Sequence, residues 1–324
     1  PLYSSAASDV YKRQNYILRR LGQAVLVLFI TYTLAFFLLS ALPSDGIMAR
    51  YGSPALGLSD EQIAQIRDEA GVDEPLAKQY FTALGGFVTG NFGYSVQTGT
   101  AVGTLIKNAL PSTLALAGVT IVISLVTALG IAYAATRRGM GWLGDFFRAL
   151  PSFTVSLPAF LAGIVLIQIF SFQLGWFNMV NPGPIEGLIL PAITLTLPLA
   201  APLTQVLIRA IDDAKTQPFV QAVRARGASE SWIFFRNVLR NAMLPTLTMA
   251  GLMFGELVGG AVVTETVFGR VGLGALTVDS VTQRDTPVLL AVVVIAATMY
   301  VIINLLVDLA YPLLDPRLRG KARS

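Results

Sequence analysis

Cysteine and histidine are both missing from the 324 residues of this chain. Their absence excludes disulfide bonds, thiol catalysis, zinc–thiolate sites and histidine-based acid–base chemistry. Charged residues are scarce as well, at 13% of the chain against about 25% in soluble domains, whereas 54% of the residues are hydrophobic. This composition predicts a protein that lies in a lipid bilayer.

Six apolar stretches are long enough to cross the hydrocarbon core, which takes about 20 helical residues. They are Ile17–Leu42, Leu114–Ala135, Phe153–Leu174, Ile189–Ile208, Leu247–Val267 and Val288–Tyr311. The predicted fold is therefore an all-α integral membrane protein with six transmembrane helices. The fourth stretch contains Pro191, Pro198 and Pro202, which either kink the helix or bend it to shape a pathway.

Lysine and arginine are distributed unequally between the two sides of these six spans. Seventeen lie on the side that holds both termini, and six lie on the other side. Because positively charged loops stay in the cytoplasm, both termini are predicted to be cytoplasmic. Residues 1–14 have no apolar pattern and are expected to be a non-native tail, and the first apolar run is expected to be a retained span.

The first loop, residues 43–113, is long enough to form an external subdomain with helices of its own. Ser59 and Gln62 have the spacing of a capping box, and Gly71 is placed to end the helix that follows. A second helix is expected from Pro75 to about Leu84, where Gly85 and Gly86 should break the pattern.

A basic cytoplasmic segment, residues 212–245, reads as a short helix, a turn and a second helix. Pro218 suits a first helical turn, Gly227 can adopt a left-handed conformation, and Ser229 is a good N-cap. The segment also carries three large aromatic residues, Trp232, Phe234 and Phe235. Such side chains in a water-facing loop need something to bury them, either a partner protein or the protein's own helices if the loop folds back on them.

This segment resembles the cytoplasmic signature of binding-protein-dependent ATP-binding-cassette permeases, in the version of the dipeptide, oligopeptide and nickel branch. The matching residues are Ala222-Val-Arg-Ala-Arg-Gly227 and Leu239-Arg-Asn-Ala-Met-Leu-Pro245, with Val223 in place of a small residue. The resemblance covers nearly the whole chain from Asn15. Further matching segments are Asn15–Arg20, Gly71–Leu76 with Gln79-Tyr80, Gly90–Ser95, Thr264–Phe268, Gly272–Gly274, Asp279, Arg284–Pro287 and Asp308–Arg317.

The resemblance implies that the segment is a coupling loop, whose short helix docks on a cytoplasmic ATPase. The implied contact residues are Gln221, Ala222, Arg224, Ala225, Arg226, Gly227, Ser229 and Trp232. The expected organisation is a first span at 15–42, the external subdomain at 43–113, a five-helix permease core at 114–317 with its coupling loop at 212–245, and a cytoplasmic tail at 318–324.

The resemblance also implies the partners of a subunit that transports solute and is not itself an enzyme. They are a second homologous permease, one or two ATPases and an external solute-binding protein, all at the bacterial inner membrane. The chain has no phosphate-binding Gly-x-x-x-x-Gly-Lys-Ser/Thr pattern, so ATP and Mg²⁺ are expected on the ATPases. No cofactor, metal or nucleic acid is expected on this chain, and its solute stays open among dipeptides, longer peptides, glutathione-like peptides and nickel chelates.

Polar residues inside the spans are candidates for a translocation path or gate. Glu256 lies near the middle of the fifth span, Glu265 near its external end, and Asn304 in the sixth. Glu256 either bonds across a helix interface or lines a polar path, and the resemblance suggests a structural or gating role for Glu265.

Two other classes of function compete with the importer. A secondary transporter would need no coupling loop, and such folds often show inverted repeats, which this sequence lacks. An intramembrane enzyme without His or Cys would be left with an aspartyl pair, for which no pair of motifs exists.

Overall fold

The computed structural model describes the backbone of residues 2–41, 46–52, 57–69, 71–137 and 139–314. Side chains are described within 18–306, except in the gaps between those ranges and at positions 49, 69 and 256. The chain divides into two compact units, each considered by itself. Unit 1 contains Pro1–Tyr11, Leu114–Arg270 and Ile302–Ser324, and unit 2 contains Lys12–Thr113 and Val271–Val301.

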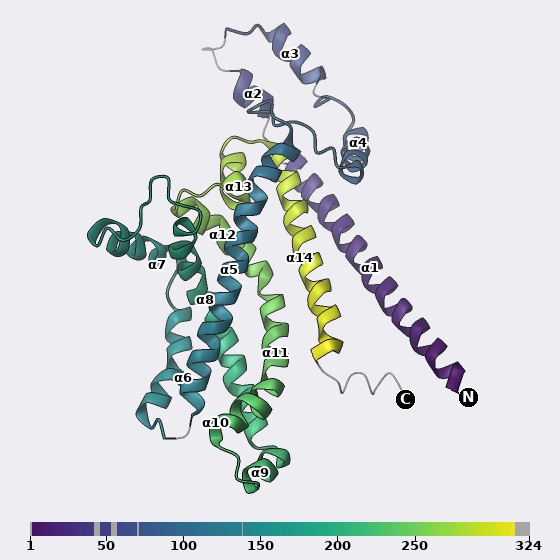
Figure 1. Cartoon of the computed structure of the whole chain (residues 1–324). Coiled ribbons are helices and arrows are strands. Elements are labelled where there is room, and N and C mark those ends of the chain that lie inside the picture. Colours follow the sequence, from purple (N-terminus) through teal and green to yellow (C-terminus); the bar gives the residue numbers. More distant parts are fainter. Residues whose placement is uncertain (1, 42–45, 53–56, 70, 138, 315–324) are drawn as a thin grey trace. The chain divides into compact units, whose positions relative to one another are not determined.

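Helices make up nearly all of both units, as the composition predicts (Figure 1). Those with residues in unit 2 are α1 (Leu2–Ala41), α2 (Gly46–Tyr51), α3 (Asp60–Glu69), α4 (Leu76–Thr89), the first part of α5 (Val102–Thr136), α13 (Leu273–Thr282) and α14 (Thr286–Leu314). Unit 1 has the remaining parts of α1, α5 and α14. Its other helices are α6 (Trp142–Val155), α7 (Ala159–Leu166), the π-helix η2 (Ile167–Gln173), α8 (Glu186–Lys215), α9 (Pro218–Ala225), α10 (Glu230–Ile233), the π-helix η3 (Phe234–Val238), α11 (Leu239–Leu252) and α12 (Phe254–Val267).

Four stretches in the described part of the chain are helical and apolar enough to span a membrane singly. They are Leu18–Ala41, Val102–Thr136, Glu186–Lys215 and Thr286–Leu306. Two bent pairs raise the number to six if each pair counts as one span: Trp142–Val155 with Ala159–Gln173, bent by 101°, and Glu230–Leu252 with Leu257–Val267, bent by 60°. The all-α membrane fold is confirmed, and the count of six holds on that condition.

The helices that contain two of the predicted spans begin earlier than those spans. The helix of the second begins at Val102, before the predicted span start at Leu114, because the end of the long loop is already helical. The third was placed at Phe153–Leu174, but α6 begins at Trp142 and the chain breaks at Ser156–Pro158. Asp145 and Arg148 made the start of α6 look like a loop, yet Arg148 forms an ion pair with Asp212 of α8 at 2.8 Å.

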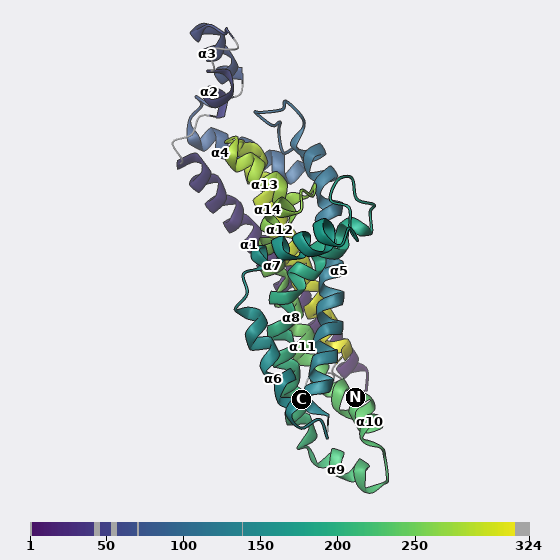
Figure 2. The same cartoon turned by 90° about the vertical axis from the view of Figure 1, so that its left-hand side faces the viewer.

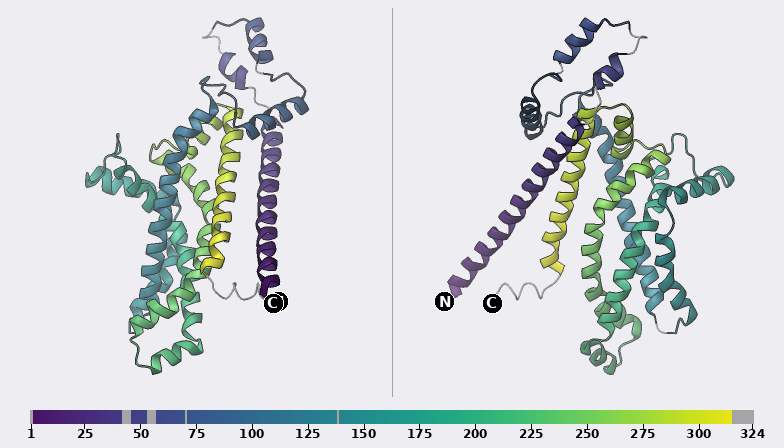
Figure 3. Two further views of the ribbon diagram at one scale, coloured as in Figure 1. Left: turned by 45° about the vertical axis from the view of Figure 1, so that its right-hand side comes forward. Right: turned by 180° about the vertical axis from the view of Figure 1, so that it is seen from behind.

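In unit 2, α4 packs against α1 through aromatic residues, and it lies across the end of α1 that finishes at Ala41 (Figure 3). The hydroxyls of Tyr80 and Thr33 lie 2.8 Å apart, and the Tyr32 hydroxyl donates to the Tyr80 carbonyl at 3.1 Å. Leu290 and Val294 of α14 belong to the same apolar cluster. The long loop is therefore anchored to two spans of its own unit.

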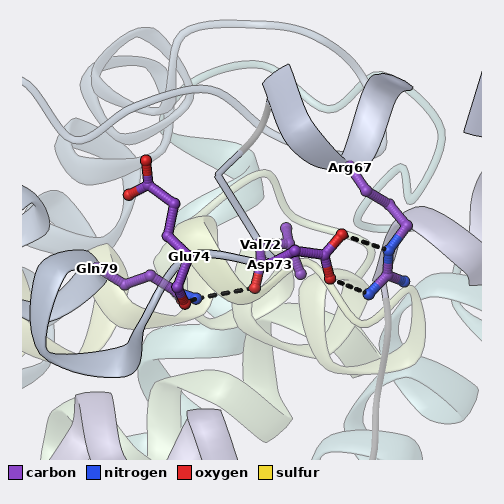
Figure 4. Close-up of polar contacts among 5 residues, drawn as sticks. All are labelled: Arg67, Val72, Asp73, Glu74 and Gln79. Atoms are coloured by element: carbon purple, nitrogen blue, oxygen red, sulfur yellow. Dashed lines mark hydrogen bonds and ion pairs between the residues drawn. The ribbon is translucent and has the colours of Figure 1, made fainter. Parts of the chain in front are cut away.

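The motif Gly71–Leu76 with Gln79 forms the turn between α3 and α4, and its polar side chains form hydrogen bonds within that turn (Figure 4). The Arg67 guanidinium donates to both carboxylate oxygens of Asp73, at 3.1 and 2.7 Å. The Gln79 amide donates to the carbonyls of Val72 and Glu74, each at 2.8 Å. These bonds satisfy polar groups that the tight turn leaves without helical partners.

The capping box at the start of α3 is confirmed. The Ser59 backbone N–H donates to the Gln62 side chain at 2.9 Å, and the Gln62 N–H donates to the Ser59 hydroxyl at 3.3 Å. Gly71 has a φ of +67°, as a residue just after a helix end often has.

The expected break at Gly85 and Gly86 was wrong, because α4 continues to Thr89 and is capped by Gly90 at φ +80°. The Asn91 N–H returns to the Gly86 carbonyl at 2.8 Å, which closes a Schellman-type cap. Glycine is required at position 86 for this approach, since a Cβ there would lie 2.5 Å from the Asn91 carbonyl oxygen.

A network of hydrogen bonds around Asp285 in unit 2 joins the end of the long loop to the turn before α14. The buried carboxylate of Asp285 accepts hydrogen bonds from the Ser95 hydroxyl, from the Val96 N–H at 3.2 Å and from the Gln97 N–H at 3.4 Å. The Arg50 guanidinium donates to the Val96 carbonyl. One carboxylate thus organises residues that are far apart in sequence.

Unit 1 is organised around α8, which packs against α6, α7, α11 and α12. The end of α8 near Lys215 joins a buried cluster with α5, α9, α10 and α11. Figure 2 shows α9 and α10 beyond the ends of α8 and α11, at the opposite end of this unit from α7.

Candidate functional site: the coupling loop and a buried polar contact

The segment between α8 and α11 has the helix–turn–helix form expected from its sequence. Pro218 opens α9, where its missing N–H has no helical acceptor to lose. Gly227 follows α9 with a φ of +82°, a conformation that costs other residues about 1–2 kcal/mol. The Ser229 hydroxyl accepts the Trp232 N–H at 3.3 Å and so caps α10. These three predictions about local structure are confirmed.

Polar contacts hold this loop to the helices around it. The Arg224 guanidinium donates to both carboxylate oxygens of Glu230, at 2.8 and 3.3 Å, across the Gly227 turn. The Lys215 ammonium donates to the carbonyl of Thr136, the last residue of α5. This carbonyl is one of those that a helix end leaves without a partner, so the bond ties α8 to α5 just before the loop begins.

The loop has a buried side and an exposed side. Val220 and Ile233 are buried in the cluster with α5 and α8, and Phe219 and Val223 pack against it. All the residues expected to contact an ATPase are exposed except Arg224, which is partly buried in its ion pair with Glu230. The exposed ones are Gln221, Ala222, Ala225, Arg226, Gly227, Ser229 and Trp232. The structure therefore leaves these residues accessible on the loop, whereas Val220 and Ile233 are buried.

One of the three aromatic residues is buried by the protein's own helices. Phe234 is 5% exposed, and its ring meets Tyr133 of α5 with centroids 4.9 Å apart. It lies in η3, whose wider π-helical turn was not foreseen from the sequence. Trp232 and Phe235 remain about half exposed, as the sequence argument expected.

At the far end of α12, Glu265 is completely buried and interacts electrostatically with Arg270. Burial lowers the pKa of Arg270, and the negative charge of Glu265 opposes that shift. The Arg270 guanidinium also donates to the backbone carbonyl of Gly187 in the first turn of α8. In a regular helix the Gly187 carbonyl would accept a hydrogen bond from the N–H of residue 191, but Pro191 has no N–H. Arg270 therefore donates to a carbonyl that lacks its helical partner.

The other two candidate path residues are less fully defined. Glu256 lies in α12, but its side chain is outside the described residues. Asn304 lies in the second half of α14 and is partly buried. Asp308, one turn further along, also has its side chain outside the described residues.

Comparison with known families gives two matches that together cover most of the chain. The model of the binding-protein-dependent transport system inner membrane component matches residues 127–320. The model of the N-terminal part of such membrane components matches residues 14–117. The chain belongs to this permease family.

Relatives of the permease match it over nearly its full length. A probable peptide ABC transporter permease of Sinorhizobium fredii, y4tP, is 35% identical over 94% of this chain and 99% of its own. The glutathione transport system permease GsiC of Escherichia coli is 34% identical over 95% of this chain and 99% of its own. The chain is thus a non-enzymatic transport subunit of an ABC importer.

Solved structures agree with the permease fold. An inward-facing form of the MetNI methionine ABC transporter matches with a TM-score of 0.55 at 20% identity, over 65% of this chain and 96% of that one. A second crystal form of the same transporter gives a TM-score of 0.53 at 19% identity.

A small cavity of the permease lies between α5, α6 and α8. Thr127, Pro151, Thr196 and Thr204 are among its lining residues, and its volume is about 50 Å³. Sites for drug-sized molecules measure about 300–1,000 Å³, so this cavity has room for water but not for a peptide. The sequence analysis did not select Arg270 and Asp285, because Gly187 and Ser95, to which they bond, lie far away in sequence. The signal for them was their place inside or beside matching motifs.

Proposed function

We propose that this permease imports small peptides through a path formed with a second permease, and that a cytoplasmic ATPase drives it through the loop around Gly227. ATP and Mg²⁺ bind on the ATPase, and an external binding protein delivers the solute. One observation supports the coupling role most directly. Ala222, Ala225 and their neighbours are exposed on a loop whose other side is buried against unit 1.

Peptides are the proposed solutes because the names of two full-length relatives refer to a peptide and to glutathione, which is itself a tripeptide. The small cavity within unit 1 supports a path that needs a second subunit, since it does not accommodate a peptide. The excess of positive charge on one side supports cytoplasmic termini and a cytoplasmic coupling loop.

Mechanical coupling follows from how the loop is attached. One end of the loop continues from α8, which Lys215 ties to α5, and the other end continues through η3 into α11. A force on α9 therefore reaches two transmembrane helices and does not dissipate in a mobile connection. The pairing of Arg224 with Glu230 makes α9 and α10 move together.

Site-directed cross-linking tests this assignment, because this chain has no native cysteine and an introduced one is its single thiol. Ala222→Cys and Ala225→Cys are expressed singly with the partner subunits, and a reagent that joins a thiol to a lysine amine is added to membranes. We expect a product of permease plus ATPase whose yield changes when ATP is added. Trp142→Cys is the matched control, because it is exposed outside the coupling loop.

Cross-linking from Trp142→Cys alone would refute the assigned loop. The substrate is tested separately by ATP-dependent uptake into proteoliposomes that hold the complete transporter and its binding protein. Accumulation of labelled dipeptide or glutathione supports peptide import, whereas accumulation of a nickel chelate with no peptide uptake contradicts it.

A further inference from the structure

Helix α4 has two apolar faces, of which only one is covered within unit 2. Tyr80 and Phe87 face α1 and α14. A second stripe, Ala77, Phe81, Gly85 and Val88, follows the helical spacing of three and four residues, and all four are exposed. Phe81 is 69% and Val88 is 82% exposed. Lys78, Gln79, Thr82 and Thr89 form the remaining polar edge.

Contacts with α1 fix the depth of α4 relative to that span. The ring of Tyr80 lies 5.3 Å from that of Phe36 and 5.7 Å from that of Phe37, centroid to centroid. Its hydroxyl reaches Thr33. At 1.5 Å per residue, Phe36 and Thr33 lie about 7 and 12 Å before Ala41, where α1 ends.

The same depth follows from α14. Leu290 and Val294, which pack in the cluster with Tyr80, come four and eight residues after Thr286, the start of that helix. These steps correspond to about 6 and 12 Å along the axis. Arg19 and Arg20 mark the polar end of the apolar part of α1, and residues 21–41 that follow extend about 32 Å, close to a hydrocarbon core of about 30 Å. Helix α4 consequently lies at the level of the acyl chains and headgroups.

The exposed stripe is linked through the ring of Tyr80, which contacts both Phe37 and Phe81, to an exposed apolar surface of α1. Leu34, Phe37 and Leu38 are exposed on α1 within its apolar span, and Phe37 stacks on Tyr80 of α4. An exposed phenylalanine beside such a surface would be costly in water but is favourable in lipid. Lys78 on the polar edge forms an ion pair with Glu74 at 2.6 Å, which keeps that edge of α4 polar.

We propose that α4 is a membrane-surface helix whose stripe of Ala77, Phe81, Gly85 and Val88 is embedded in the lipid leaflet at the Ala41 end of α1. In this position α4 braces α1 against α14 and fixes the level at which the long loop leaves the bilayer. The occupant of the stripe is lipid and not a second protein chain.

Spin labelling of this cysteine-free chain, assembled in nanodiscs with partner subunits from which any cysteine has been removed, tests the proposal. Phe81→Cys and Val88→Cys each receive a nitroxide, and its collisions with oxygen, which favours lipid, are compared with those of a water-soluble nickel chelate. Leu38→Cys serves as the lipid reference, Asp68→Cys as the water reference, and Thr82→Cys as the matched control on the polar edge of α4. We expect labels at 81 and 88 to favour oxygen as the label at 38 does, and the label at 82 to favour it less.

Preference for the nickel chelate at 81 and 88 would overturn the proposal, because it would place the stripe in water. Low accessibility to both reagents would also overturn it, since a protein chain would then cover the stripe; a change upon addition of the solute-binding protein would identify that chain. Charge provides a second test. Val88→Asp should lower the yield of assembled transporter several-fold while Thr82→Asp leaves it unchanged, and equal yields would contradict a lipid-embedded stripe.

Discussion

Arg224 and Glu230 form a two-pronged ion pair across the Gly227 turn, with nitrogen–oxygen distances of 2.8 and 3.3 Å. The pair joins α9, which carries much of the exposed surface, to α10, which leads through η3 into α11. Both side chains are partly exposed, so the pair contributes little to global stability, roughly 0–1 kcal/mol. It therefore favours one arrangement of the two short helices without holding them rigidly.

Breaking this pair should reduce coupling more than stability. For Arg224→Ala we expect ATP hydrolysis to continue while peptide uptake per ATP falls, with a change in melting temperature of only a few degrees. The exchange variant Arg224→Glu with Glu230→Arg should recover part of the uptake, because the opposite charges face each other again. Uptake and hydrolysis measured in the same proteoliposomes check this; a single variant with parental uptake per ATP would contradict it.

Two neighbouring glycines in α4 should respond in opposite ways. In Gly86→Ala the new Cβ meets the Asn91 carbonyl at 2.5 Å, so the helix cap must shift, and we expect a destabilisation of about 1–3 kcal/mol. In Gly85→Ala the Cβ meets nothing within 4 Å, and alanine favours the helix by roughly 0.5–1 kcal/mol. Thermal unfolding of the purified complex distinguishes them. Equal effects of the two variants would argue against the cap.

The electrostatic interaction of Arg270 with the buried Glu265 should appear as coupling between the two residues. Arg270→Gln removes a positive charge that favours the buried carboxylate, so we expect it to lower the melting temperature. Adding Glu265→Gln to that variant should restore much of the loss, although the Gly187 carbonyl would still lack its charged donor. Melting temperatures of the two single variants and the double variant provide the measurement. Simple additivity of the two losses would show that the residues act independently.

Acid should loosen the turn between α3 and α4. The hydrogen bonds from Arg67 lower the pKa of Asp73 below its usual value, which is about 3.9. A carboxyl whose pKa is lower when folded stabilises the turn above its unfolded pKa, and this contribution is lost as the pH falls through the folded value. Limited proteolysis of the turn should therefore accelerate below about pH 4, whereas Asp73→Asn should be cleaved faster already at pH 7 and with a flatter pH dependence.

Local signals in the sequence were enough for the elements that depend on neighbouring residues. The Ser59–Gln62 capping box, the left-handed Gly227 and the Ser229 cap each follow from a few adjacent residues, and hydropathy alone locates the first span. The family resemblance depends on ordered motifs of this local kind.

Local sequence signals could not predict contacts between segments that are distant in the sequence. Whether Arg148 belongs to a loop or to a helix depends on Asp212, which lies 64 residues later. Phe234 is buried because Tyr133 meets it at a π-helical turn, for which no residue pattern was available. The role of Arg270 depends on an open carbonyl created by a proline in another helix.

The hydrogen-bond network around Asp285 determines when the long loop can fold during biosynthesis. Ser95 leaves the ribosome 190 residues before the carboxylate that it will bond, which corresponds to roughly 10–40 s of translation at about 5–20 residues per second. Until then the end of the long loop lacks the acceptor for its Ser95 hydroxyl and its Val96 and Gln97 N–H groups. The loop can reach its final form only when the last span is being inserted, so a truncated nascent chain would expose a half-finished loop to proteases that monitor membrane protein quality.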